Sequence, residues 1–207
     1  MLAYFYFEVL PTIGTTRIVR RVIKAIQPDA DMKKRLADVE ECGSVANKMA
    51  LADECINGAL FDDAIRLYQS CMNGPYANDP SLHYGVGEAA FYKGDYALAR
   101  RELWSIIEQQ PFFKTGDAKL LYARALEALN ELEAADLQYQ TLVLQYTGEE
   151  ARCRHALLLQ RMGREPAAKV LFEEILRKAA KGSMPWRRLQ KEWIDIARQQ
   201  TQAKSSA

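Results

Sequence analysis

The side chains that could do chemistry are two histidines, four cysteines and several adjacent pairs of carboxylates. His83 and His155 could act as nucleophiles or general acids, but each lies in an apolar, helix-like stretch where a packing role is expected. Cys153 precedes His155 by two residues, and residues two apart on a helix point to different sides, so no catalytic pair is predicted. The adjacent acids are typical of solvated helix starts and faces: Glu40-Glu41, Asp62-Asp63, Glu149-Glu150 and Glu173-Glu174.

The motifs that bind nucleotides or catalytic zinc do not occur in this sequence. There is no GxxxxGK[ST] loop, no GxGxxG segment opening a helix, and no HExxH pair. Gly85-Val86-Gly87 is interpreted as a small-residue contact between helices rather than a phosphate-binding loop. The cysteines have no CxxC spacing and are predicted to be reduced and mostly packed: Cys42, Cys55, Cys71 and Cys153. We therefore expect no enzyme activity, no cofactor and no metal site.

A local pattern that recurs four times predicts the architecture. Its central residues follow one another at intervals of 35, 36 and 33 positions: Ala64, Ala99, Ala135 and Ala168. Five residues earlier stands a small or turn-forming residue: Ala59, Gly94, Asn130 or Gly163. Three residues earlier stands Phe61, Tyr96, Leu132 or Glu165, and four residues later a bulky apolar one, Tyr68, Leu103, Tyr139 or Phe172. A period near 34 residues predicts helical hairpins that bury their apolar faces by stacking on their neighbours.

Composition and residue size agree with such an array. The 207-residue chain is 49% hydrophobic and 27% charged, which favours a folded core over disorder. Small residues in the first helices would let the two helices of a hairpin approach closely: Gly87, Ala123 and Ala156. Pro185–Gln199 is predicted to form one further amphipathic helix that caps the last hairpin. Its apolar stripe would consist of Trp186, Leu189, Trp193 and Ile196.

These spacings resemble the tetratricopeptide repeat family over residues 45–180. Signature positions of that family are matched by Gly87, Gly94, Tyr96, Ala99 and Pro111, and by the alanines and bulky residues of the other units. The resemblance implies an all-α, right-handed superhelical solenoid of about four helix–turn–helix repeats. The family's signature tryptophan is replaced by Lys48, His83, Lys119 and Arg152, so no well-defined peptide ligand is implied.

The resemblance also implies that the first helix of each repeat lines a concave binding surface. On that register, the candidate peptide-binding residues are Met49, Asp53, Tyr84, Glu88, Phe91, Arg124, Glu127, Arg154 and Arg161. Aromatic and arginine side chains are common anchors of interfaces. Phe91 and Tyr92 have a second interpretation, because either could fill a gap between repeats. The expected partner is a protein or peptide of unknown identity.

The first residues indicate contact with a membrane. Met1–Leu10 is apolar and aromatic apart from Glu8, and it is half as long as a helix that crosses a bilayer. Four basic residues follow, which we expect at a membrane surface: Arg17, Arg20, Arg21 and Lys24. The segment is interpreted as the cytoplasmic end of a transmembrane helix or as an amphipathic helix on anionic lipid. Alternatively, Met1–Leu10 folds onto the first repeats.

The layout is similar to a group of bacterial membrane proteins that have a short N-terminal transmembrane hairpin and a cytoplasmic tetratricopeptide array. That hairpin resembles the N-terminal segment of some phospholipase D-like proteins. The matching stretches are Phe7–Pro11, Leu67–Pro75, Leu120–Leu129 and Glu150–Arg164. The resemblance implies a cytoplasmic, membrane-associated protein whose hairpin is largely missing from this chain. Phospholipase D catalysis is not expected, because Gly85 and Leu157 replace the lysine that should follow each histidine.

The sequence thus predicts five segments: a hydrophobic stub (1–12), basic amphipathic juxtamembrane helices (13–43), the repeat array (44–182), a capping helix (183–199) and a disordered tail (200–207). The main functional prediction is a non-enzymatic protein-interaction module or scaffold. The alternative is a soluble nucleic-acid-binding repeat protein that uses the basic C-terminal helix with Arg187, Arg188, Lys191 and Arg198. Basic residues exceed acidic ones by five in residues 13–35 and by six in 177–204, so the rest of the chain has a net charge of about −10. This acidic remainder argues against the alternative, because it would repel phosphates.

Overall fold

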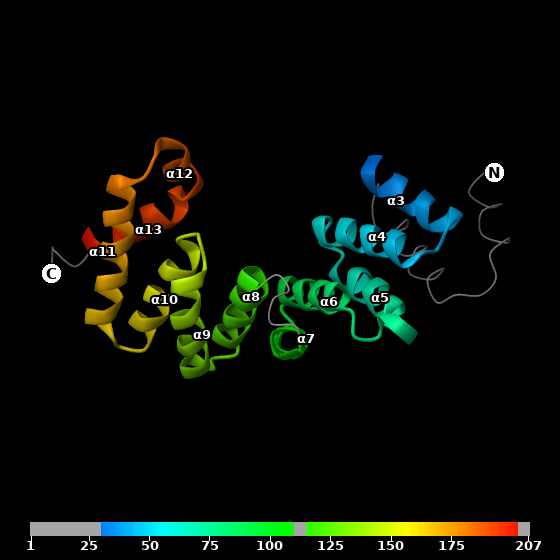
Figure 1. Ribbon diagram of the computed structural model, residues 1–207, viewed down its shortest axis with the longest axis horizontal. Coiled ribbons are helices and arrows are strands. Elements are labelled where there is room, and N and C mark those ends of the chain that lie inside the picture. Colours follow the sequence, from blue (N-terminus) through cyan, green and yellow to red (C-terminus); the bar gives the residue numbers. More distant parts are fainter. Residues whose placement is uncertain (1–29, 110–114, 203–207) are drawn as a thin grey trace. The chain divides into compact units, whose positions relative to one another are not determined.

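The computed structural model describes residues 30–109 and 115–202, and all regular secondary structure in these ranges is helical. The chain separates into two compact units, Met1–Phe113 and Lys114–Ala207. The first contains α3 (Ala30–Glu41), α4 (Val45–Asn57), α5 (Phe61–Cys71), the 3-10 turn η1 (Gly74–Tyr76), α6 (Pro80–Lys93) and α7 (Tyr96–Gln109) (Figure 1). The second contains α8 (Thr115–Ala128), α9 (Leu132–Gln145), α10 (Glu150–Arg161), α11 (Glu165–Lys181), α12 (Met184–Leu189) and α13 (Lys191–Gln202). From α3 to α7, and again from α8 to α11, each helix packs on the next one in the sequence.

The four predicted turns have the same backbone geometry. The residue five positions before each alanine has a left-handed φ of 57°, 90°, 61° or 73°: Ala59, Gly94, Asn130 and Gly163. The amide of the following residue donates to the carbonyl five residues earlier at 2.7 to 2.9 Å in all four turns. The next helix then begins at the predicted residue, namely Phe61, Tyr96, Leu132 or Glu165. The sequence pattern therefore marks structurally equivalent turns.

The alanines lie where the two helices of each hairpin meet. Ala64, Ala99, Ala135 and Ala168 are all 0% exposed, and the bulky residues four positions later are at most 2% exposed. In the first helices, Gly87, Ala123 and Ala156 are also buried, as predicted. A Cβ added to Gly87 would lie 2.8 Å from Cγ of Leu103, so this helix pair has no space for a larger residue. The predicted register is confirmed for these positions.

Ala99→Leu is expected to lower the free energy of unfolding by about 1–3 kcal/mol, because Ala99 is completely buried and its surroundings would be overpacked. Ala97→Leu is the matched control, because Ala97 is an exposed residue two positions earlier on α7. Urea unfolding followed by circular dichroism measures both variants. Equal stability of the two variants would contradict the packing role of Ala99.

The helix before the predicted array packs against the first hairpin. Residues 30–41 form α3, which was assigned to the juxtamembrane segment but packs on α4 through buried Met32, Leu36 and Val39. The side chain of Asn47 on α4 donates to the carbonyls of Asp38 and Cys42, both at 2.8 Å, and so ties the two helices together. The three buried residues are spaced by four and three positions, as expected for one face of a helix. The basic residues 33–35 between the first two make this apolar spacing hard to recognise in the sequence. The predicted stub at 1–12 lies outside the described residues, and so do the four residues predicted at a membrane surface, Arg17, Arg20, Arg21 and Lys24.

The C-terminal segment also differs from the prediction. It forms two helices, α12 and α13, separated at Gln190, and α13 extends to Gln202 rather than ending at residue 199. The Gln190 side chain is buried and accepts a hydrogen bond from the amide of Glu149 at 2.8 Å. This break shifts the apolar stripe, so that Ile194 and Ala197 are buried while Leu189 is 78% exposed. The tail prediction is therefore wrong for residues 200–202. Trp186, Trp193 and Ile196 do pack, as predicted, against the last core cluster, whose buried residues include Phe172, Ile175 and Ile194.

The N-cap of α6 is Asp79, whose side chain accepts from the amide of Ser81 at 2.8 Å. Glu149 was expected on a solvated helix start but is 2% exposed, because Arg152, Lys178 and Gln190 surround it.

Of the helices in the described ranges, none has the length and apolar character needed to cross a bilayer.

Candidate protein-binding faces

The predicted binding residues of the first unit lie on α4 and α6, which we call the α4–α6 face. Met49, Tyr84, Glu88 and Phe91 are partly buried, whereas Asp53 is exposed. The two helices contact each other directly, and Asp53 and Glu88 both lie near the Tyr68 hydroxyl. This face combines apolar and aromatic side chains with two carboxylates.

A tyrosine from the second helix of the first hairpin contacts this face. The hydroxyl of Tyr68, on α5, donates to the carboxylate of Asp53. Burial of the ring, followed by the charges of Asp53 and Glu88, raises the pKa of Tyr68 above its usual value. Tyr68 therefore stays protonated and acts as a hydrogen-bond donor. A Cβ on Gly85 would lie 2.4 Å from this ring, which explains the small residue at that position of α6.

The structure gives Phe91 a partly structural role. Its ring makes edge contacts with Tyr96 on α7 and with Tyr92, at centroid distances of 5.4 and 5.7 Å. Tyr92 is 50% exposed and stacks on Phe61 at 6.2 Å. Tyr84, the other aromatic residue of the α4–α6 face, is not one of the rings in these contacts.

In the second unit, the structure brings the other four predicted residues together. We call this set the α8–α10 face: Arg124 and Glu127 on α8, and Arg154 and Arg161 on α10. Arg161 contacts Glu127 at 2.8 Å, and Glu127 also accepts from the hydroxyl of Tyr139 at 3.2 Å. Burial and the nearby Glu127 raise the pKa of Tyr139, so this hydroxyl remains a donor as well.

A second carboxylate completes the α8–α10 face. Glu150 lies 2.7 Å from Arg154 on the same helix and 3.9 Å from Arg124 on α8. The guanidinium of Arg154 also lies over the ring of Trp193 on α13, 5.1 Å from its centroid. Three arginines thus meet two glutamates, and all five side chains are 21 to 47% exposed. The face has one positive charge in excess and stays accessible to solvent.

Sequence reasoning missed Tyr139, Glu150 and Trp193 as members of this face. Glu150 stands four residues before Arg154, a helical spacing that predicts an ion pair and could have identified it. Trp193 gave no such signal, because it was assigned to the apolar stripe of a single capping helix. After the break at Gln190, α13 contacts α10.

His155 and three of the four cysteines are buried, and His83 is partly buried. His83 contacts Glu102 at 2.7 Å, and the buried His155 contacts Asp136 at 2.7 Å and stacks on Tyr139. Burial raises the pKa of the Cys55 and Cys153 thiols to about 12, so both stay protonated. The structure records all four cysteines as free, three of them buried. In the described ranges, no three potential metal ligands form a cluster.

Comparison with protein-family models, with curated proteins and with solved structures finds no match. The likeness to tetratricopeptide repeats therefore stays a prediction from the residue pattern.

Proposed function

We propose that this chain is a non-enzymatic interaction module of the tetratricopeptide type, which binds a protein or peptide partner through the first helices of its hairpins. We further propose that its four hairpins form a right-handed superhelix and that it works on the cytoplasmic side of a bacterial membrane. The proposal is supported by the equivalent turns and by the grouping of predicted binding residues on two faces.

The observation that carries this proposal is the α8–α10 face. Its arginines are held by glutamates and an indole ring, and they remain partly exposed. Such ordering lowers the entropy cost of binding, because the side chains are already restricted before a partner arrives. An excess arginine favours a partner with carboxylates, which guanidinium groups bind in bidentate fashion.

The test compares two double variants of the second unit. Arg124→Ala/Arg161→Ala removes two cations from the α8–α10 face. Lys169→Ala/Arg177→Ala, the matched control, removes two exposed cations from the second helix of a hairpin, α11. Loss of a true anchor costs about 2 kcal/mol or more, which is visible as lost capture in a pull-down from lysate. Partly exposed ion pairs contribute only about 0–1 kcal/mol each, so both variants are expected to fold.

The proposal requires the first variant to lose partners that the wild type and the control retain, as identified by mass spectrometry. Circular dichroism of each variant confirms that folding is intact. Tyr84→Ala tests the α4–α6 face in the same way. If the folded face variants and the control capture the same proteins as wild type, binding does not use these faces.

The alternative of nucleic-acid binding has less support. Base stacking needs exposed aromatic rings. Trp186 and Trp193 are instead partly buried against the last core cluster, and Arg154 covers the Trp193 ring. A titration with single-stranded RNA at two salt concentrations tests this alternative directly.

A further inference from the structure

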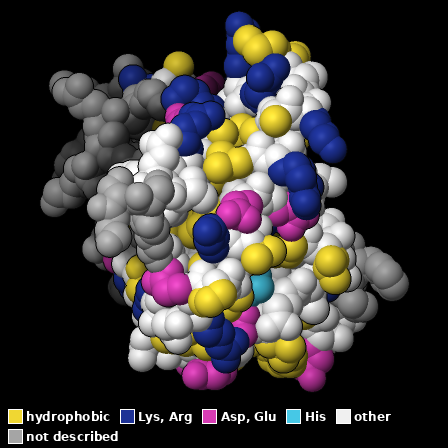
Figure 2. Space-filling model, turned by 90° about the vertical axis from the view of Figure 1, so that its left-hand side faces the viewer, with side chains coloured by type: hydrophobic (Ala, Val, Ile, Leu, Met, Phe, Trp, Pro, Cys, Tyr) yellow, Lys and Arg dark blue, Asp and Glu magenta, His cyan; other side chains and the backbone are white. Residues whose placement is uncertain are grey.

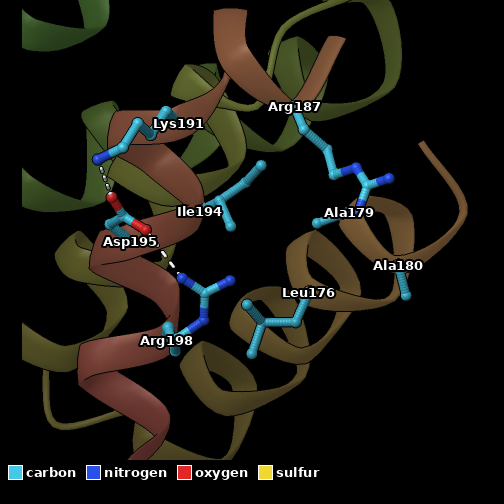
Figure 3. Close-up of a pocket in the computed structure, with 8 residues that line it drawn as sticks. All are labelled: Leu176, Ala179, Ala180, Arg187, Lys191, Ile194, Asp195 and Arg198. Carbon is cyan, nitrogen blue, oxygen red and sulfur yellow. Dashed lines mark hydrogen bonds and ion pairs between the residues drawn. The ribbon is translucent and has the colours of Figure 1, made fainter. Parts of the chain in front are cut away.

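An open groove lies between α11, α12 and α13 and has a volume of about 400 Å³. Its floor is apolar and consists of Leu176, Ala179 and Ile194, with cations along its sides (Figure 3). On one side, Lys191 and Arg198 bind Asp195 at 2.7 and 2.8 Å. Figure 3 shows Arg187 on the opposite side, reaching along the groove from α12. The groove therefore combines an apolar floor with an excess of positive charge.

Next to this groove, α12 presents large apolar side chains to solvent. Met184 is 59% exposed and Leu189 is 78% exposed. Trp186, in contrast, packs toward the core, and a Cβ on Gly182 would lie 2.6 Å from its ring. Because Trp186 holds the inner side of this short helix, the exposed side chains have a fixed direction. This orientation leaves Arg187, Arg188 and Leu189 available to a partner.

The surroundings of α12 are strongly basic. Residues 177–202 contain seven lysines and arginines but only two acids. Figure 2 shows Lys and Arg side chains interleaved with hydrophobic ones at the top of the view, where α12 lies, with Asp and Glu side chains lower down. Exposed apolar side chains among cations are the pattern of proteins that insert shallowly into anionic membranes.

We propose that the α12 edge, defined as Met184, Arg187, Arg188 and Leu189, docks on an anionic lipid surface. Met184 and Leu189 enter the boundary between headgroups and acyl chains, while the arginines bind lipid phosphates. A lipid surface fits better than a peptide here, because these apolar side chains protrude instead of lining a recess. This surface shares no residue with the α4–α6 or α8–α10 faces, so it does not depend on the proposed protein-binding function.

The probe is a vesicle of 70% phosphatidylcholine and 30% phosphatidylglycerol, and binding is measured by cosedimentation of the full chain. All variants carry Arg17, Arg20, Arg21 and Lys24 replaced by Gln, so that the N-terminal segment contributes no basic charge. The chain with only these four Gln substitutions, called the background, is expected to bind the vesicles, and to bind them more weakly at high salt. Adding Arg188→Gln/Leu189→Ser is expected to weaken partitioning by about tenfold, because a charge and an inserted side chain are both lost.

The matched control is Lys169→Gln/Val170→Ser, which changes an adjacent cation and exposed apolar residue on α11. Both pairs are on the surface, so circular dichroism is expected to be unchanged. Support requires weaker binding of the α12 variant and full binding of the control. The proposal is wrong if the background fails to bind, if both variants bind equally, or if the α12 substitutions abolish binding to single-stranded RNA instead of vesicles.

Discussion

Glu149→Ala is expected to lower the free energy of unfolding by about 3–5 kcal/mol, because it removes the main partner of the buried Arg152, which then keeps as an ion-pair partner only the more distant Glu174 at 3.5 Å. Glu149 is 2% exposed and binds the guanidinium of Arg152, whose side chain is itself only 7% exposed. Its other oxygen lies 3.3 Å from Nζ of Lys178 on α11. The substitution therefore removes the central anion that links the start of α10 to α11.

Glu150→Ala is the matched control for this prediction. Glu150 is the next residue along the chain and also binds arginines, but its side chain is 22% exposed. We expect a loss of no more than about 1 kcal/mol. The double variant Glu149→Ala/Arg152→Leu should recover part of the stability, since it also removes the buried cation that has lost its main partner. Urea unfolding measures all three, and equal losses at positions 149 and 150 would contradict the buried-charge argument.

Truncation after Gly182 is expected to have a larger effect than any single substitution. It removes α12 and α13, whose Ile194 and Ala197 are buried and whose two tryptophans and Ile196 pack on the last core cluster. A buried side chain of this size contributes about 1.5–3 kcal/mol, so the total loss should exceed about 5 kcal/mol. Phe172 and Ile175 would then face solvent. The expected result is a marked fall in melting temperature, or aggregation, in calorimetry and size-exclusion chromatography.

A shorter truncation provides the control. Removal of residues 203–207 leaves α13 complete and should not change the melting temperature. Gln190→Ala tests one component of the longer truncation, because it removes only the side chain that accepts from the Glu149 amide. If the chain ending at Gly182 is as stable and soluble as the full chain, α12 and α13 do not cover the core in solution.

The parts of the fold that the sequence predicted well are those set by local residue size. Left-handed turns and close helix crossings restrict the residue at one position, so Gly94 and Ala99 reveal them directly. The candidate residues Arg124 and Glu127 came from the repeat register that the family resemblance implies, and in the structure they lie near Arg154 and Arg161 through ion pairs.

The features that were missed depend on contacts between residues far apart in the chain. At the break, the Gln190 side chain accepts a hydrogen bond from an amide 41 residues earlier, which no helical periodicity indicates. Burial of Glu149 likewise requires Lys178, 29 residues away, in addition to the neighbouring Arg152. The packing of α3 was overlooked for a different reason, since a basic run conceals the apolar spacing of Met32, Leu36 and Val39.

The Tyr68 ring against Gly85 also constrains how the hairpins can be ordered. Tyr68 belongs to the first hairpin and Gly85 to the second, and the ring lies where a side chain at position 85 would begin. Counted back from the left-handed turn residues, the counterparts of Gly85 in the third and fourth hairpins are Leu121 and Arg154. Neither of those hairpins could follow the first one without displacing Tyr68. The chain therefore encodes the succession of its first two hairpins, and simple duplication or exchange of units would not preserve this junction.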